Sequence, residues 1–166
     1  YDMLGSRVLQ ESMEAGQRWM IHHVGGSPIR QWDSRGFTRR ITYDALQRPL
    51  EIWVSENEPA EFLAEKTVYG ESKPDPETTN HRTRVWQVYD GAGLASSEKY
   101  DFKGNPLAST RRLLTNCQAQ VVWNLEPALE DESFTSSTGY DALNRPVQIT
   151  APPSDRSGGL PNIIYP

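Results

Sequence analysis

The sequence predicts an all-β fold of repeated antiparallel β-hairpins, with at most one short helix near residues 60–66. Three observations predict it: a short aromatic-Asp word that recurs along the chain, a residue suited to positive φ near the end of most copies, and turn signals 11 residues apart. Because such repeated units cannot bury a face alone, we expect them to stack on one another as a modular scaffold.

The recurring word, called the turn word below, has an aromatic residue at its first position, Asp at its second and usually Gly at its fifth. Tyr-Asp occurs five times, and Trp32-Asp33 is a sixth near-copy. Gly and Asn enter positive φ at the lowest cost, and Asp followed three residues later by Gly favours a type I turn. We therefore predict a structural role in the repeated turns for Tyr1, Asp2, Gly5, Trp32, Asp33, Gly36, Tyr43, Asp44, Tyr89, Asp90, Gly93, Tyr100, Asp101, Gly104, Tyr140, Asp141 and Asn144.

Two shifts of the sequence onto itself show that the words belong to longer repeats. A shift of 57 residues places Asp33 on Asp90 and Tyr43 on Tyr100. A shift of 97 residues places residues 43–52 on residues 140–149, with 7 of 10 residues identical. Turn signals at this spacing leave about seven residues for each strand, which is an ordinary strand length.

We expect the strands between the turns, where apolar and polar residues alternate or where β-branched and aromatic residues gather. One of them ends at Gly25-Gly26, a predicted hairpin turn. Pro49, Pro106 and Pro146 stand where a strand begins, a position that tolerates a missing N–H. The expected strands are residues 8–10, 18–22, 28–32, 37–43, 50–55, 82–89, 107–114 and 118–123, the last two forming a hairpin around Thr115-Asn116.

Other segments depart from the strand pattern. Residues 57–65 have Pro near their start, acidic residues in the first turn and strong helix formers after it, which predicts a short helix. Residues 72–79 are expected to form a surface loop, and residues 126–133 to be irregular. Pro152-Pro153 and Ser157-Gly158-Gly159 predict a loop or linker. The predicted organisation is a β-sheet segment over residues 1–151, interrupted by an insertion at about 55–83, then a linker over residues 152–166 that continues into a longer protein.

Composition and charge exclude several classes of protein. The 166 residues are 36% hydrophobic and 10% aromatic, which favours a thin hydrophobic layer over a thick core. There are 17 Lys and Arg against 22 Asp and Glu, with no basic block longer than two residues, so we expect no nucleic-acid partner. No apolar run approaches the roughly 20 residues needed to span a bilayer. Cys117 is alone, so it can form neither an internal disulfide nor a cysteine-based zinc cage.

The candidate catalytic and metal-binding residues are better explained by structural roles. His22 and His23 are expected on opposite faces of a strand, where they cannot bind one metal together, and His81 is expected to have a surface or packing role. The repeated aspartates resemble the paired carboxylates of a glycosidase, but an active site is needed once and a turn is needed in every repeat. Cys117 has no identifiable base, and no dinucleotide loop, nucleophile elbow or zinc-protease motif occurs. We therefore expect no enzyme activity, no metal and no small-molecule cofactor.

In three copies the turn word runs into an apolar strand, at residues 1–8, 100–107 and 140–147. In this form the sequence resembles the YD-repeat (RHS-repeat) family, as in bacterial toxin-complex and RHS toxin shell proteins. The resemblance covers roughly residues 1–151. Two features depart from the family pattern: Gln47 stands where Gly is expected, and the stretch at about 55–83 interrupts the period.

The resemblance implies a large hollow β-shell, of which this chain would form part of the curved wall. It implies a non-catalytic function, because the shell encapsulates and helps to deliver a C-terminal toxin polypeptide. The implied partners are neighbouring repeats of the same longer polypeptide, the enclosed toxin polypeptide and other toxin-complex subunits. The implied location is secreted or extracellular. The shell-closing region and the toxin are not recognisable in this sequence.

A second class of function fits the same composition, namely a cell-surface adhesion or carbohydrate-binding β-repeat module. Exposed Trp and Tyr side chains on a sheet stack on sugars. The exposure of the tryptophans separates the two classes, because burial between strands indicates a wall and an exposed row indicates sugar binding. The residues in question are Trp19, Trp32, Trp53, Trp86 and Trp123.

Overall fold

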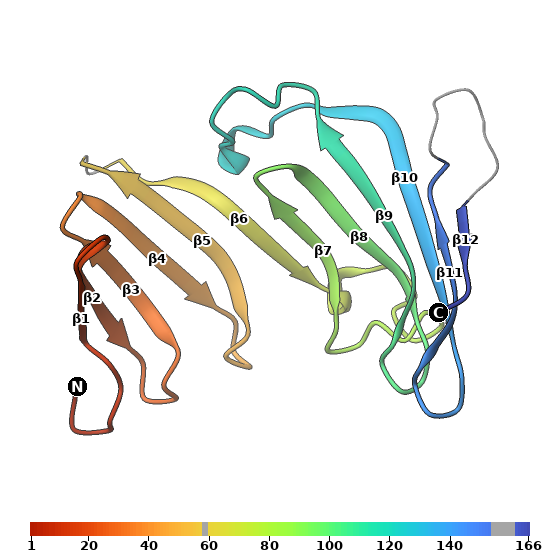
Figure 1. Cartoon of the computed structure of the whole chain (residues 1–166), viewed down its shortest axis with the longest axis horizontal. Coiled ribbons are helices and arrows are strands. Elements are labelled where there is room, and N and C mark those ends of the chain that lie inside the picture. Colours follow the sequence, from red (N-terminus) through yellow and green to blue (C-terminus); the bar gives the residue numbers. More distant parts are fainter. Residues whose placement is uncertain (58–59, 154–161) are drawn as a thin grey trace. The chain divides into compact units, whose positions relative to one another are not determined.

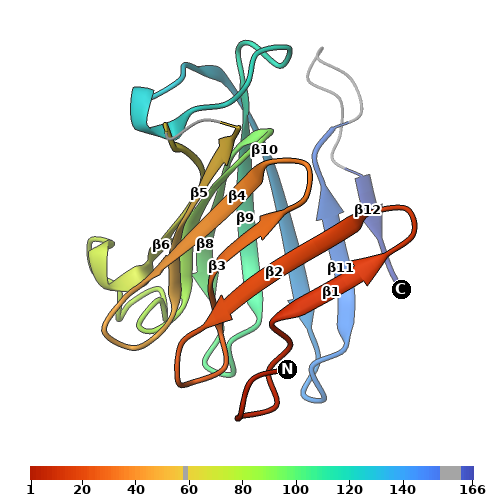
Figure 2. The ribbon, with the colours of Figure 1, turned by 90° about the vertical axis from the view of Figure 1, so that its left-hand side faces the viewer.

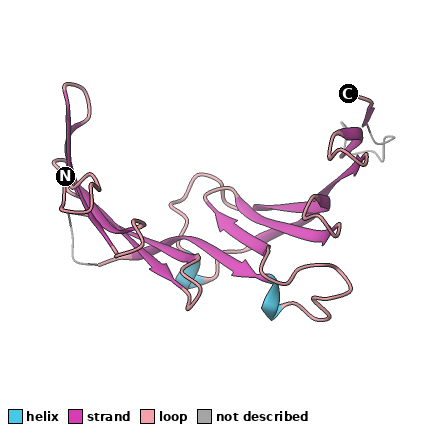
Figure 3. Cartoon of the chain, turned by 90° about the horizontal axis from the view of Figure 1, so that it is seen from below, coloured by secondary structure: helices cyan, strands magenta, loops and turns pink. Residues whose placement is uncertain are grey.

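The regular secondary structure of the chain is almost entirely β-strand, as Figure 3 shows for the computed structural model, which describes residues 1–57, 60–153 and 162–166. The predicted all-β fold is confirmed. Two 3-10 segments, η1 (Gly70–Ser72) and η2 (Trp123–Leu125), are the helical elements of the described residues. The strands are β1 (Leu9–Ser12), β2 (Gly16–His22), β3 (Pro28–Asp33), β4 (Phe37–Tyr43), β5 (Pro49–Glu56), β6 (Phe62–Tyr69), β7 (Val85–Asp90), β8 (Gly93–Tyr100), β9 (Pro106–Leu114), β10 (Leu129–Tyr140), β11 (Pro146–Ala151) and β12 (Asn162–Ile164).

The strands follow one another in the sheet in their order along the chain, from β1 to β12 (Figure 1). The chain divides into two compact units. Unit 1 comprises residues 1–66 and 121–126, and unit 2 comprises residues 67–120 and 127–166. The strand pairs whose register is described are antiparallel, so short turns suffice to join most neighbours.

In unit 1 the register places two sets of side chains on opposite faces of the sheet. Trp19 of β2 lies opposite Trp32 of β3, and their rings stack with centroids 6.4 Å apart. Arg18 lies opposite Asp33, one residue along each strand, and therefore faces the other side. Figure 2 shows β1 to β4 running side by side in this unit.

The hydrophobic core is thin. The buried apolar side chains of the described residues are few, and each is 5–8% exposed: Ile41, Leu63 and Trp123 in unit 1, and Tyr100 and Leu114 in unit 2. Most other residues of the strands are half-buried or exposed. Stability in such a sheet comes from cross-strand pairs and from the turns that fix the register.

The prediction of a helix near residues 60–66 is wrong. Residues Phe62–Tyr69 form β6, which pairs with β5 and places Leu63 opposite Trp53. The helix preference of Ala, Leu, Glu and Lys is worth less than about 0.7 kcal/mol per residue, and here strand pairing and the burial of Leu63 override it. The Leu63 N–H also donates to Asn124 Oδ1 at 3.1 Å. Glu58 and Pro59, in the predicted first turn, lie outside the described residues.

The prediction of a hairpin between residues 107–114 and 118–123 is also wrong. β9 pairs with β10, and the Thr115 N–H donates to the Ala128 carbonyl at 3.1 Å. The Asn116 side chain accepts from the N–H groups of Gln118 and Ala119, which turns the chain away from the sheet. Trp123 then begins η2 and is buried. Part of the segment predicted to be irregular, from Leu129 onward, belongs to β10 instead.

The predicted loop over residues 152–166 contains a strand. β12 pairs with β11 and places Ile164 opposite Ile149. β-branched residues at 163 and 164 favour this pairing. Ser157-Gly158-Gly159, from which the linker was predicted, lies outside the described residues. The strand predicted over residues 82–89 begins only at Val85. The residues before it form a turn, in which the Arg84 N–H donates to the His81 carbonyl.

Candidate functional site

The six aspartates of the turn words each accept backbone hydrogen bonds within their own turn. Asp44 is representative: its Oδ1 accepts from the N–H groups of Leu46 and Arg48, both at 2.9 Å. The Gln47 N–H donates to the Asp44 carbonyl, and the Asp44 N–H donates to the Arg48 carbonyl. The carboxylates of Asp2, Asp33, Asp90, Asp101 and Asp141 accept from two backbone N–H groups in the same way.

The fifth position of every turn word has positive φ. The angles are 80° at Gly5, 90° at Gly36, 62° at Gln47, 138° at Gly93, 104° at Gly104 and 61° at Asn144. Gln47, the departure from the family pattern, therefore takes the left-handed conformation that Gly takes elsewhere. A residue with a side chain has a steric cost in this conformation. Gln47 nevertheless adopts it, because the turn requires positive φ at this position.

Most of the turn aspartates also bind a guanidinium group. Arg48 Nε lies 2.7 Å from Asp44 Oδ2, Arg145 Nε lies 2.8 Å from Asp141 Oδ2, and Arg111 Nη1 lies 2.8 Å from Asp90 Oδ2. Arg35 pairs with Asp33, and the Asn105 amide takes this place at Asp101. Each of these carboxylates thus holds its own turn, and that of Asp90 also binds Arg111 of the strand β9.

These contacts lower the pKa values of the carboxyl groups. The pKa of Asp90 falls chiefly because the Arg111 side chain donates to it, and the pKa values of Asp44 and Asp141 fall chiefly through the backbone N–H groups of Arg48 and Arg145. A general acid of a glycosidase needs the opposite shift, toward a raised pKa. The geometry and the shifts therefore favour a structural role for these aspartates.

Two first-position tyrosines close their hairpins by the same contact. The Tyr43 hydroxyl donates to the Pro28 carbonyl at 2.7 Å, and the Tyr100 hydroxyl donates to the Val85 carbonyl at 2.7 Å. Both donors and both acceptors are 57 residues apart, so the repeat read in the sequence extends to side-chain contacts. A histidine ring lies edge-on to each tyrosine: His23 to Tyr43 at 5.3 Å and His81 to Tyr100 at 5.1 Å between centroids.

A seventh turn has the same geometry. The sequence predicted a hairpin turn at Gly25-Gly26, but not its equivalence to the turn words, because His23 stands where the others have Asp. The Gly25 N–H donates to His23 Nδ1 at 2.8 Å, and the Gly26 N–H donates to the His23 carbonyl at 2.9 Å. Gly26, at the fifth position, has φ 83°. The signal that could have found it is Pro28 at the seventh position, which matches Pro49, Pro106 and Pro146.

The third histidine is a buried structural residue. His81 is fully buried, and its two ring nitrogens lie 2.7 Å from Thr79 Oγ1 and from the Ser97 carbonyl. Its backbone fits against Gly70, where a Cβ would lie 2.1 Å from the His81 carbonyl oxygen. This burial could not be predicted from the local sequence, since His81 lies among polar residues. Among the described residues, no group of three or more His, Cys, Asp and Glu could hold a metal ion.

The tryptophans do not form an exposed row. Trp123 is buried, and Trp19, Trp32, Trp53 and Trp86 are half-buried. The ring of Trp53 lies 5.3 Å from the Arg40 guanidinium and that of Trp86 lies 5.7 Å from Lys73 Nζ, so cations already contact these two rings. This arrangement resembles packing within a wall more than a row of sugar-binding platforms.

Comparisons with known proteins find similarity to a toxin subunit and to several solved structures. The chain is 25% identical over 167 residues to the toxin subunit YenC2 of Yersinia entomophaga, covering 85% of this chain and 17% of that protein. The crystal structure of TcdB2-TccC3 matches 91% of this chain and 8% of that chain, with a TM-score of 0.81 and 20% identity. A structure of the Tc holotoxin pore of Photorhabdus luminescens matches 99% of this chain and 8% of that chain, with a TM-score of 0.81 and 19% identity. The chain shares its fold with these structures.

The chain spans less than a fifth of the length of YenC2, so it corresponds to a small part of that protein. No protein-family model matches it, and membership of the YD-repeat family stays a prediction. The described residues include no helix that is long and apolar enough to cross a membrane.

Proposed function

We propose that the chain is a non-catalytic structural segment of an RHS/YD-repeat shell, which encapsulates and helps to deliver a C-terminal toxin polypeptide. The observation that carries the proposal is the repetition of one turn geometry at Asp2, Asp33, Asp44, Asp90, Asp101 and Asp141 in a sheet that shares its fold with TcdB2-TccC3. A repeated turn serves a scaffold, since each copy fixes the register of the strands that it joins.

The proposed partners follow from this role. They are neighbouring repeats of the same longer polypeptide, an enclosed toxin polypeptide and other toxin-complex subunits, and the proposed location is extracellular. The thin core supports the proposal, because a single layer with half-buried faces suits a wall better than a self-contained globule. The alternative, a carbohydrate-binding module, has less support because cations contact Trp53 and Trp86.

Electron cryomicroscopy of the full polypeptide that contains this segment tests the proposal. The expected result is a hollow β-shell with polypeptide density inside it and with this segment in the wall. Protease treatment of the same sample should leave the enclosed polypeptide intact until the shell is denatured. A solid domain without an internal cavity, or a hydrolytic activity that disappears in Asp101→Asn while the fold is kept, would overturn it.

A further inference from the structure

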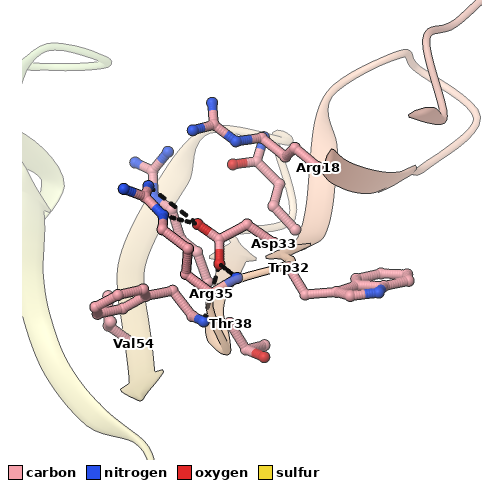
Figure 4. Close-up of a pocket in the computed structure, with 9 residues that line it drawn as sticks. Arg18, Trp32, Asp33, Arg35, Thr38 and Val54 are labelled. Carbon is pink, nitrogen blue, oxygen red and sulfur yellow. Dashed lines mark hydrogen bonds and ion pairs between the residues drawn. The ribbon is translucent and has the colours of Figure 1, made fainter. Parts of the chain in front are cut away.

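A cleft of about 480 Å³ lies on one face of unit 1, and arginines dominate its charge. Arg18, Arg35 and Arg39 line it together with a single acidic residue, Asp33. The register explains how they meet: Arg18 lies opposite Asp33, and Arg39 lies opposite Gln31, which is two residues from Asp33 on the same face. Figure 4 shows Arg18 and Arg35 on the side of Asp33, and the Trp32 side chain pointing away.

The charges of this cleft are not balanced from within. Arg35 forms an ion pair with Asp33 at 3.2 Å, and the Asp33 carboxylate also accepts from the backbone N–H groups of Arg35 and Phe37. Asp33 is therefore already paired and does not neutralise the other two arginines. Arg18 and Arg39 are exposed, and across the part of the chain that the structure describes neither guanidinium group has a hydrogen bond or an ion pair. Two uncompensated guanidinium groups therefore share one cleft on a chain of net charge −5.

An apolar surface lies beside the two arginines. Phe37 precedes Arg39 by two residues on β4 and is 40% exposed, and Val54 lies directly opposite Arg39 on β5. Both line the cleft. A ligand that fills it must offer negative charge to the guanidinium groups and an apolar group to Phe37 and Val54.

We propose that this cleft binds an extended acidic peptide segment of a partner protein, of the form Glu-x-Glu-x-Leu. Guanidinium groups bind carboxylates through two parallel hydrogen bonds. Arg18 and Arg39 lie on either side of β3, about 12 Å apart at Cα by ordinary strand spacing. Two carboxylates two residues apart on an extended peptide are separated by about 7 Å, and the long arginine side chains bridge the difference. The next alternate residue then reaches Val54, which lies directly opposite Arg39 on β5.

Charge complementarity favours a peptide over a nucleic acid. The cleft has one acidic residue among its charged lining, and the chain as a whole is acidic, so a long polyanion meets repulsion outside the cleft. A short acidic peptide places its carboxylates only beside the two arginines and has no further negative charge outside the cleft. The inference does not depend on the proposed shell function, since it rests on the residues of unit 1 alone.

Fluorescence anisotropy with a labelled peptide Gly-Glu-Ser-Glu-Ser-Leu-Gly, titrated with the full chain, tests the proposal. We expect saturable binding that weakens as salt rises, and at least about tenfold weaker binding of the matched peptide with Gln in place of Glu. The variant Arg18→Gln/Arg39→Gln should lose at least about tenfold in affinity for the same reason. The control Arg7→Gln/Arg30→Gln removes the same charge outside the cleft and should keep the affinity.

Circular dichroism of each variant shows whether the fold is kept. If the glutamine variant does not fold, Arg18→Lys/Arg39→Lys replaces it, and weaker binding is expected because lysine lacks the planar fork. The proposal is overturned if the Glu peptide does not bind, or if the cleft variant and the control variant bind it equally. Tighter binding of inorganic polyphosphate or of single-stranded DNA than of the peptide, lost in the same cleft variant, would also overturn it in favour of a phosphate site.

Discussion

At the scale of single residues, the second and fifth positions of the turn word stabilise each turn. The Asp carboxylate satisfies two backbone donors, and the fifth residue takes positive φ in all six words. The sequence predicted both features from residue type alone, because Asp and Gly are the cheapest residues for those tasks. Gln47 and His23 show that the turn also forms with less favourable residues once the flanking strands pair.

Replacing the turn glycines separates the cost of the backbone conformation from the cost of crowding. Gly5→Ala meets nothing within 4 Å at φ 80°, so it should lower the free energy of unfolding by about 1 kcal/mol through the backbone alone. Gly93→Ala should cost more, because its Cβ would lie 2.1 Å from the Arg112 carbonyl oxygen. Gly91→Ala, in open space, serves as the control. Urea denaturation measures all three, and an equal loss at Gly5 and Gly91 would contradict the φ argument.

The opposite change at Gln47 should stabilise the protein. Gln47→Gly relieves a left-handed conformation of a residue with a side chain, and the gain, at most about 1 kcal/mol, is reduced by the greater freedom of Gly in the unfolded chain. Urea denaturation of this variant beside Gln10→Gly, on a strand, provides the comparison. Destabilisation of Gln47→Gly as large as that of Gln10→Gly would show that the Gln47 turn is not strained.

The lowered pKa values of the turn aspartates predict acid sensitivity. A carboxyl group whose pKa is lower in the folded state contributes stability above its unfolded pKa of about 3.9, and this contribution is lost as the pH falls through the folded pKa. For Asp90 the shift comes chiefly from the Arg111 side chain. Unfolding free energies measured from pH 6 downward should therefore decrease below about pH 4–5. Asp90→Asn should flatten this decrease, and Asp131→Asn, an exposed residue of β10, should not.

At the scale of elements, the sequence predicted strands well where a turn word bounds them. β4 was predicted with its observed ends, Phe37–Tyr43, because a word stands on each side. The errors at β6, β10 and β12 arose where no word marks the start of the strand. There the outcome depends on a partner distant in sequence, such as Asn124 for Leu63, and local propensity carries no information about that partner.

The turn at His23 should depend on the ring as an acceptor. His23→Ala removes the acceptor of the Gly25 N–H and the edge contact with Tyr43, and should cost about 1–2 kcal/mol of unfolding free energy. His23→Asp restores the usual second residue of the turn word and should cost less than His23→Ala. Thermal and urea denaturation of the two variants give the comparison. If Asp is as destabilising as Ala here, the seventh turn is not equivalent to the other six.

At the scale of the whole molecule, the exposed strand edges determine behaviour in solution. β1 and β12 stand at the two ends of the strand order, and Leu9, Ile163 and Ile164 are exposed there. Backbone N–H and C=O groups on an edge strand recruit further strands. The sequence predicted the strand near residues 8–10, but it did not predict β12, whose Ile163 and Ile164 give the other end an apolar edge as well.

Light scattering on the purified chain tests whether the chain is a segment of an open β-wall. At concentrations on the order of tens of micromolar we expect reversible self-association through β1 and β12. The variant Leu9→Lys/Ile163→Lys, which places charge on both edges, should be largely monomeric. Leu125→Lys removes an exposed apolar residue of η2 away from the edges and should associate like the parent chain. A parent chain that stays fully monomeric would contradict the account and favour a self-contained binding module.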